Sequence, residues 1–170
     1  MEVEFDVKIK AGDLYDYMLR HTYSGLSGIL GTIVGILLIA NFVINGGFIS
    51  AIIGVVVILY LPWTLFLKSQ QQAAGNPAFK EPLHFKMTDA GVEISQGDAV
   101  QQQAWSDMVK AVSTQKSIIL YTSKVNASIF PKRELGEKIP AIIEMISTHM
   151  PPNKVKIKAE SGRFRKALFE

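Results

Sequence analysis

The sequence predicts an α+β membrane protein in which a transmembrane helical hairpin separates an N-terminal strand from a C-terminal β domain. Three observations lead to this prediction. No charged side chain occurs between Ser24 and Leu67. An alternating polar and apolar segment at residues 2–10 precedes this stretch, and several short alternating segments divided by turn residues follow it. A long uncharged stretch is typical of membrane spans, whereas alternation with a period of two residues is typical of strands that bury one face.

Residues 1–22 are expected to form a strand and then an amphipathic helix. The stretch EVEFDVKIK alternates strictly, which predicts a strand half buried against a partner. The stretch GDLYDYMLRH follows, with Asp13 as a candidate cap, and predicts a short helix lying along the membrane surface. The apolar side of the strand consists of Val3, Phe5, Val7 and Ile9, and the helix face of Leu14, Tyr17, Met18 and His21.

Residues 23–67 are long enough for two membrane crossings, because one crossing needs about 20 apolar residues. The tripeptide Asn-Gly-Gly at 45–47 interrupts the apolar run, and it favours a turn because glycine adopts positive φ without steric cost. The prediction is therefore a hairpin with helices at 26–44 and 48–67. The acidic start of the chain disfavours a cleaved signal, and the lack of polar faces at helical spacing disfavours a soluble core.

The distribution of cations predicts the orientation of this hairpin. Lys8, Lys10 and Arg20 precede the first span, and Lys68 and Lys80 follow the second, while the connecting turn carries no charge. Because loops rich in Lys and Arg stay on the cytoplasmic side, both termini are expected in the cytoplasm. The predicted location is the cytoplasmic (inner) membrane, with lipids around two spans.

Small residues in both spans are candidates for helix packing, because they let helix backbones approach closely in lipid. Gly28, Gly31 and Gly35 lie in the first span and Gly54 in the second. Either the two helices of one hairpin pack through these residues, or the residues mediate homo-oligomerisation or contact with another membrane protein. The spans carry no ionisable group that would line a pore.

Residues 68–81 are polar and rich in turn residues, and they are expected to be a linker. Residues 82–150 should form six strands and a helix, because short segments divided by turn residues, the first two of them alternating, precede an apolar helical stripe. These segments are LHFKM, GVEIS, VQQQAW, MVKAVS, SIILYTS and VNASIF, and the stripe lies in IPAIIEMISTHM. A set of strands followed by one C-terminal helix is typical of a pleckstrin-homology-like antiparallel sandwich or barrel. Such a domain commonly has seven strands, one more than these six. We therefore expect residues 2–10 to complete this sheet, with the hairpin as an insertion in one split fold.

The order of these parts carries a resemblance to a known family. It comprises GDLYDYMLRH, the hairpin, GVEIS, the Trp of QQQAWSDMVKAVS, SIILYTS, and SIFPKREL before the terminal helix. Over residues 2–150 the chain resembles the YcxB-like family of small bacterial membrane proteins. The resemblance implies a membrane location and a pleckstrin-homology-like fold, and it brings no catalytic residue to carry over.

The sequence contains no recognisable catalytic or metal-binding motif. There is no cysteine, and His21, His84 and His149 share no metal-ligand spacing. No nucleophile elbow of the form Gly-x-Ser-x-Gly is present. We therefore predict that the protein is not an enzyme and uses no cofactor or metal.

Three side chains are candidates for lipid or partner contact. Trp105 is either a core residue or an exposed contact, and the core alternative is favoured because a large ring at the end of a strand is usually buried. Lys132 and Arg133 either meet lipid phosphates or lie in a solvated turn. The basic tail, residues 151–170, supplies much of the net charge of +3 and would be attracted to an anionic surface. Nucleic acid is disfavoured as a partner, because few aromatic residues lie among these cations.

The function predicted from the sequence is a non-enzymatic, membrane-anchored interaction module that binds a protein partner or inner-leaflet lipid. Two alternatives stay open: an immunity protein that neutralises a bacterial toxin, and an accessory subunit of a transporter or sensor complex.

Overall fold

A computed structural model describes residues 2–157, and these residues form two compact units. The helical unit comprises residues 10–76. The β unit combines residues 2–9 with the described chain from residue 77 onward. The structure is therefore α+β, with one unit inserted into the sequence of the other.

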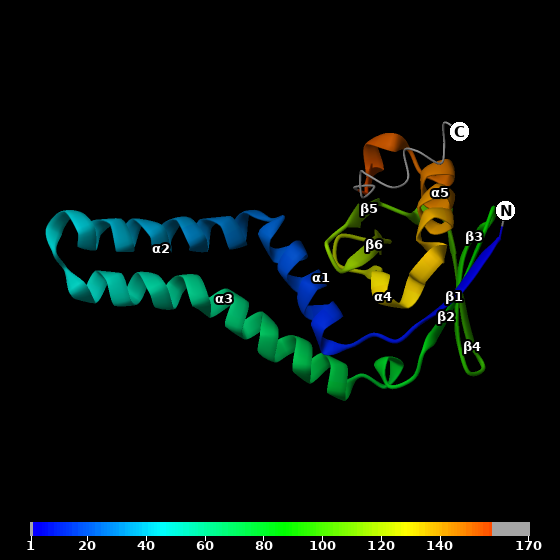
Figure 1. The fold of residues 1–170 in the computed structure, drawn as a ribbon, viewed down its shortest axis with the longest axis horizontal. Coiled ribbons are helices and arrows are strands. Elements are labelled where there is room, and N and C mark those ends of the chain that lie inside the picture. The colour runs from blue at the N-terminus through cyan, green and yellow to red at the C-terminus, as the bar shows by residue number, and fades with distance from the viewer. Residues whose placement is uncertain (1, 158–170) are drawn as a thin grey trace. The chain divides into compact units, whose positions relative to one another are not determined.

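The helical unit consists of α1 (Ala11–Tyr23), α2 (Leu26–Asn45) and α3 (Phe48–Gly75). Helices α2 and α3 run side by side as a hairpin (Figure 1). The turn depends on Gly46, whose φ of 71° lies in the left-handed region and whose N–H donates to the Phe42 carbonyl at 2.8 Å. The helices expected at 26–44 and 48–67 are both present.

Helix α1 is anchored at its start and along one side. Asp13 was expected to precede the helix as its cap, but it lies inside the first turn, where its carboxylate accepts the Lys10 N–H at 2.8 Å. Leu14 is buried, and Tyr15 packs edge-on against Phe66 of α3 with ring centroids 5.8 Å apart. Helix α1 therefore packs on the hairpin.

Helix α3 is longer than the predicted second span. Residues 68–75, expected to begin a linker, are helical and continue α3 to Gly75. The physical reason is that Gln and Ala are good helix formers, so the polar stretch keeps the helix going. Asn76 and Pro77 end it, because a residue before proline is driven out of the helical region.

The β unit contains two four-stranded sheets. The first has the order β1-β2-β3-β4 and the second the order β7-β6-β5-β8. The strands of the first sheet are β1 (Val3–Val7), β2 (Leu83–Thr88), β3 (Gly91–Gln96) and β4 (Ala99–Ala104). Those of the second are β5 (Lys110–Ser113), β6 (Ser117–Tyr121), β7 (Ala127–Pro131) and β8 (Val155–Lys156). Helices α4 (Lys132–Leu135) and α5 (Ile139–His149) follow β7, and short 3-10 turns span Pro77–Phe79, Trp105–Asp107, Gly136–Lys138 and Pro152–Lys154.

The N-terminal strand pairs with a strand from the other side of the insertion. Strand β1 lies antiparallel to β2, with Val3 opposite Met87, Phe5 opposite Phe85 and Val7 opposite Leu83. Figure 1 shows β1, in blue, beside the green strands of the first sheet. The prediction that residues 2–10 complete this sheet is confirmed, and the six strands expected between residues 82 and 130 are all present.

The core of the β unit lies on the apolar side of these strands. The rings of Phe5 and Phe85 stack at 5.5 Å, and both meet Phe130 of β7 edge-on, at 5.3 and 4.9 Å. The predicted apolar stripe of α5 contributes Ile142 and Ile146, which are fully buried. Strand β1 thus supplies one ring of an aromatic cluster in the middle of the β unit.

Candidate functional site

The outer face of the first sheet carries a row of polar side chains. The strand register places Glu4, Lys86, Glu93 and Gln102 side by side across β1 to β4. The Lys86 Nζ lies 2.9 Å from Glu4 Oε1 and 2.9 Å from Glu2 Oε1. At the other end of the row, the Gln102 amide donates to Glu93 Oε2 at 2.9 Å.

The charges in this row are not evenly matched. Hydrogen bonding to Lys86, together with its charge, holds the Glu4 pKa below its usual value, and hydrogen bonds to Glu4 and then Glu2 raise the pKa of Lys86. Lys86 is therefore paired with the carboxylates of Glu2 and Glu4 on the side of β1. Glu93 has an amide as its partner, and within residues 2–157 neither Glu93 nor Asp107 forms an ion pair.

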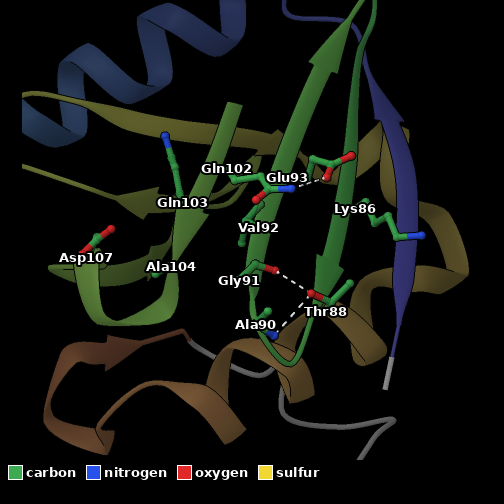
Figure 2. A pocket seen from close by; sticks show the side chains of 10 residues that line it. All are labelled: Lys86, Thr88, Ala90, Gly91, Val92, Glu93, Gln102, Gln103, Ala104 and Asp107. Carbon is green, nitrogen blue, oxygen red and sulfur yellow. Dashed lines mark hydrogen bonds between the residues drawn. The ribbon is translucent and has the colours of Figure 1, made fainter. Parts of the chain in front are cut away.

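A pocket of about 350 Å³ lies along strands β2, β3 and β4 at this row. Figure 2 shows Lys86 and Asp107 at opposite ends of the pocket, with Gly91 and Ala104 between them. Its lining residues are Lys86, Thr88, Ala90, Gly91, Val92, Glu93, Gln102, Gln103, Ala104 and Asp107. Small side chains leave space in the middle, and the acidic and amide groups lie around it.

Gly91 allows the close approach of β3 and β4 beneath this pocket. A Cβ at Gly91 would collide with the backbone carbonyl of Gln103. A larger residue would push the two strands apart, since the obstacle is backbone and cannot rotate away. The pocket therefore depends on glycine at position 91.

Strand β4 forms one edge of the first sheet and extends beyond the core. All of its residues except Gln103 are exposed, including Val100 at 60%. Gln101 and Gln103 occupy positions that face the core side on the neighbouring strands, and the Gln103 Oε1 is buried without a hydrogen-bond partner. This strand carries amides on both faces.

Strand β1 forms the opposite edge, and cationic side chains cover it. The Lys138 Nζ donates to the Glu4 carbonyl at 2.7 Å, and the Arg133 guanidinium donates to the Lys8 carbonyl at 2.9 Å. Arg133 also pairs with Glu134 at 3.0 Å. Arg133, a candidate for lipid contact, thus holds the end of β1 in place, and its neighbour Lys132 begins α4.

Trp105, the third candidate, is buried in the structure. Its side chain is 8% exposed, and its ring N–H donates to the Thr88 carbonyl at 2.8 Å. The ring stacks on His149 at 5.1 Å, and His149 Nε2 lies 3.3 Å from Asp89 Oδ1. Of the two alternatives for Trp105, the core alternative describes the structure, in which the ring joins the β2–β3 turn to the end of α5.

Two of the four candidate packing glycines lie where the backbones of α2 and α3 come close together. A Cβ at Gly54 would approach the Gly35 carbonyl to 2.7 Å, and one at Gly35 would approach the Gly54 carbonyl to 2.9 Å. Gly31 has more room, since its Cβ would lie 3.5 Å from Leu61 Cδ1. Gly28 differs from the expectation: the nearest obstacles to a Cβ belong to Thr22 and Tyr23, so it makes room for the turn between α1 and α2.

Metal-binding groups do not contribute to this site. Over the described residues, no group of three or more His, Asp and Glu side chains is placed to hold a metal ion. The outer row of the first sheet, with its pocket and the edge strand β4, is therefore the candidate functional site. The sequence analysis missed it, although the alternation in GVEIS places Glu93 on the polar face.

The fold and the site together define a class: an α+β chain whose β unit is interrupted by a hairpin of two long apolar helices and carries a row of polar side chains on the outer face of one sheet. Comparison with known families agrees with the resemblance found in the sequence. A family model described as YcxB-like protein matches residues 88–146, which run from the end of β2 into α5. No curated protein and no solved structure matches the chain.

Proposed function

We propose that the chain is anchored in the cytoplasmic membrane by α2 and α3, with both termini in the cytoplasm. The β unit would then be a non-enzymatic, pleckstrin-homology-like module that binds a partner protein. The observation that carries the proposal is the apolar exterior of the hairpin. Only 11% of the most apolar stretch of α2 and 6% of that of α3 is buried within the structure.

This exterior supports membrane anchoring because it would be costly in water. Leu37, Ile44 and Ile49 are 62%, 79% and 72% exposed. Each apolar side chain transferred out of water gains about 1.5–3 kcal/mol, so a bilayer around the hairpin accounts for side chains that the fold leaves uncovered. Both helices are long enough to cross a bilayer.

The arrangement of the β unit supports the pleckstrin-homology-like assignment. Two antiparallel-rich sheets enclose one core, and α5 packs its buried face into that core after the last long strand. The split between β1 and β2 leaves this order of strands intact.

A protein partner is favoured over inner-leaflet lipid by the charges of the site. The outer row carries Glu2, Glu4 and Glu93 around the single cation Lys86, and such a face repels lipid phosphates. Arg133, which could meet a phosphate, is engaged by the Lys8 carbonyl and Glu134.

The proposal is tested by single cysteines, because the chain has none of its own. Gly47→Cys places a thiol in the hairpin turn, and Ala74→Cys places one on the exposed end of α3. In intact cells an impermeant maleimide should label Gly47→Cys alone, and after permeabilisation it should label both. Labelling of Ala74→Cys in intact cells, or recovery of the chain in the soluble fraction, would refute membrane anchoring with cytoplasmic termini.

A further inference from the structure

The two edges of the first sheet differ in how their backbone groups are satisfied. Strand β3 is joined to β4 through the two-residue loop Gly97–Asp98, with Gln96 opposite Ala99. In such a hairpin the flanking residues form a hydrogen-bonded pair, and pairs alternate along the ladder. The N–H and C=O groups of Ala99, Gln101 and Gln103 therefore face β3. Those of Val100, Gln102 and Ala104 face outward.

The same alternation places the carbonyls of Glu4 and Lys8 on the outer edge of β1, where Lys138 and Arg133 cover them. Strand β4 has no such cover within residues 2–157, and its sequence AVQQQA contains neither lysine nor proline. Exposed edges of natural sheets usually carry such residues, because an open edge pairs with other strands. Strand β8, at an edge of the second sheet, is only two residues long.

Charge identifies the kind of strand that fits this edge. Val100, Gln102 and Ala104 share one face with Glu93, so every second residue of an added strand would lie beside the pocket. Two strand spacings, about 10 Å, separate such a residue from Glu93, and a long cationic side chain together with the Glu93 side chain bridges that distance. Asp107 stands at the far end of the pocket (Figure 2).

We propose that the open edge of β4 binds an extended segment of a partner protein that carries Lys or Arg at every second position. The backbone of the segment pairs with Val100, Gln102 and Ala104, and its cations meet Glu93 and Asp107. This inference rests on the proposed function and names the chemistry of its partner. A second copy of this chain fits less well. Pairing β4 with itself brings no cation to either carboxylate, and in the chain's own alternating stretch Lys154 donates to the Met108 carbonyl while Val155 and Lys156 pair with β5.

The test uses the full chain in nanodiscs of zwitterionic lipid and a synthetic peptide, Thr-Lys-Val-Lys-Val-Lys-Thr, with Thr-Glu-Val-Glu-Val-Glu-Thr as its matched control. Amide exchange is followed residue by residue by nuclear magnetic resonance. The basic peptide should slow exchange at Val100, Gln102 and Ala104, and the acidic peptide should not. Binding should weaken with added salt, since exposed charges are screened.

Two sets of variants separate the backbone from the charge contribution. Gln102→Pro removes an outward N–H without touching the ladder to β3, and Gln102→Thr keeps that N–H. Gln102→Pro should lower the affinity for the basic peptide about tenfold relative to Gln102→Thr. Glu93→Gln combined with Asp107→Asn should also lower it about tenfold, with the fold retained because both side chains are at the surface.

Several results would overturn the inference: equal binding of both peptides, unchanged affinity in Gln102→Pro, or failure of the basic peptide to bind. Protection of the three amides that rises with protein concentration would assign the edge to a second copy. Protection produced by anionic lipid alone would assign it to the membrane surface. Protection by anionic lipid would also overturn the protein partner of the proposed function. The other failures leave the proposed function standing if the cysteine labelling places the β unit in the cytoplasm, whereas a reversed labelling pattern defeats it whatever the peptide does.

Discussion

The helical unit exposes large aliphatic side chains, whereas the β unit buries them in its core. In α2, Leu37 is 62% exposed, whereas Ile118 and Ile119 of β6 are fully buried. In the hairpin, glycines lie where α2 and α3 come close together, and in the β unit, aromatic rings pack in the core. The comparison teaches that leucine and isoleucine content does not locate a core, because what matters is which side of the element faces the surrounding medium.

The largest effect is expected at the strand that crosses from one side of the insertion to the other. Phe5→Ala removes one of three packed rings and should destabilise the β unit by about 3–5 kcal/mol, because a cavity remains in the core. Amide exchange of β2 and β3 in the detergent-solubilised chain measures this loss. Val100→Ala, at an exposed position, serves as the control and should leave exchange unchanged.

The comparison itself is tested by truncating one buried and one exposed side chain. Ile119→Ala should cost about 2–5 kcal/mol in the β unit, because the side chain is fully enclosed. Leu37→Ala should leave the unfolding of the helical unit in detergent nearly unchanged, because its side chain is not packed within the fold. A cost for Leu37→Ala as large as for Ile119→Ala would mean that α2 is covered by protein.

A smaller effect is expected at the glycine contact of the hairpin. Gly54→Leu should destabilise the helical unit by about 1–3 kcal/mol, because the added side chain meets the Gly35 carbonyl, which cannot move aside. Gly31→Ala is the matched control, since its methyl group has van der Waals room against Leu61. Thermal unfolding in detergent, monitored through α2 and α3 exchange, should separate the two variants.

The smallest effect concerns the surface of the β unit. Lys86 lowers the Glu4 pKa through a hydrogen bond and its charge, so this pair adds stability above the unfolded-state pKa of glutamate. That contribution is lost as pH falls through the depressed folded-state pKa of Glu4. The stability difference between the native chain and Lys86→Met should therefore be small at pH 7 and should shrink further in acid. The exposed Lys124→Met should show no such trend in chemical denaturation at several pH values.

The sequence predicted the elements that follow a regular period. Strict alternation located β1, turn residues at short spacings located the six strands after the hairpin, and the uncharged stretch with its Asn-Gly-Gly turn located α2 and α3. The extension of α3 to Gly75 was missed because polarity was taken as a sign of a linker, although Gln and Ala continue a helix. Strand β8 pairs in parallel with β5 over two residues, too few to show a period.

The candidate site was harder to predict, because it depends on register. Glu93 and Gln102 could be assigned to polar faces from alternation, but their pairing at 2.9 Å follows from the register that the Gly97–Asp98 loop sets between β3 and β4. The role of Arg133 depends on a carbonyl 125 residues earlier in the chain, at Lys8, and no local pattern shows this contact. Gly28 likewise leaves room for the backbone of Thr22 and Tyr23 at the turn between α1 and α2, a contact that its place in the apolar stretch does not indicate.

The insertion of the hairpin between β1 and β2 has a consequence in time. Glu2 and Lys86, which meet across the β1–β2 pair, are 84 residues apart. At ribosomal rates of about 5–20 residues per second, β1 leaves the ribosome on the order of ten seconds before its partner strand exists. Closing that loop costs about 4 kcal/mol in chain entropy, which the packing of α1 on α3 reduces by bringing the two ends of the insertion together. The first strand to be synthesised therefore has no partner until the whole helical unit has been made.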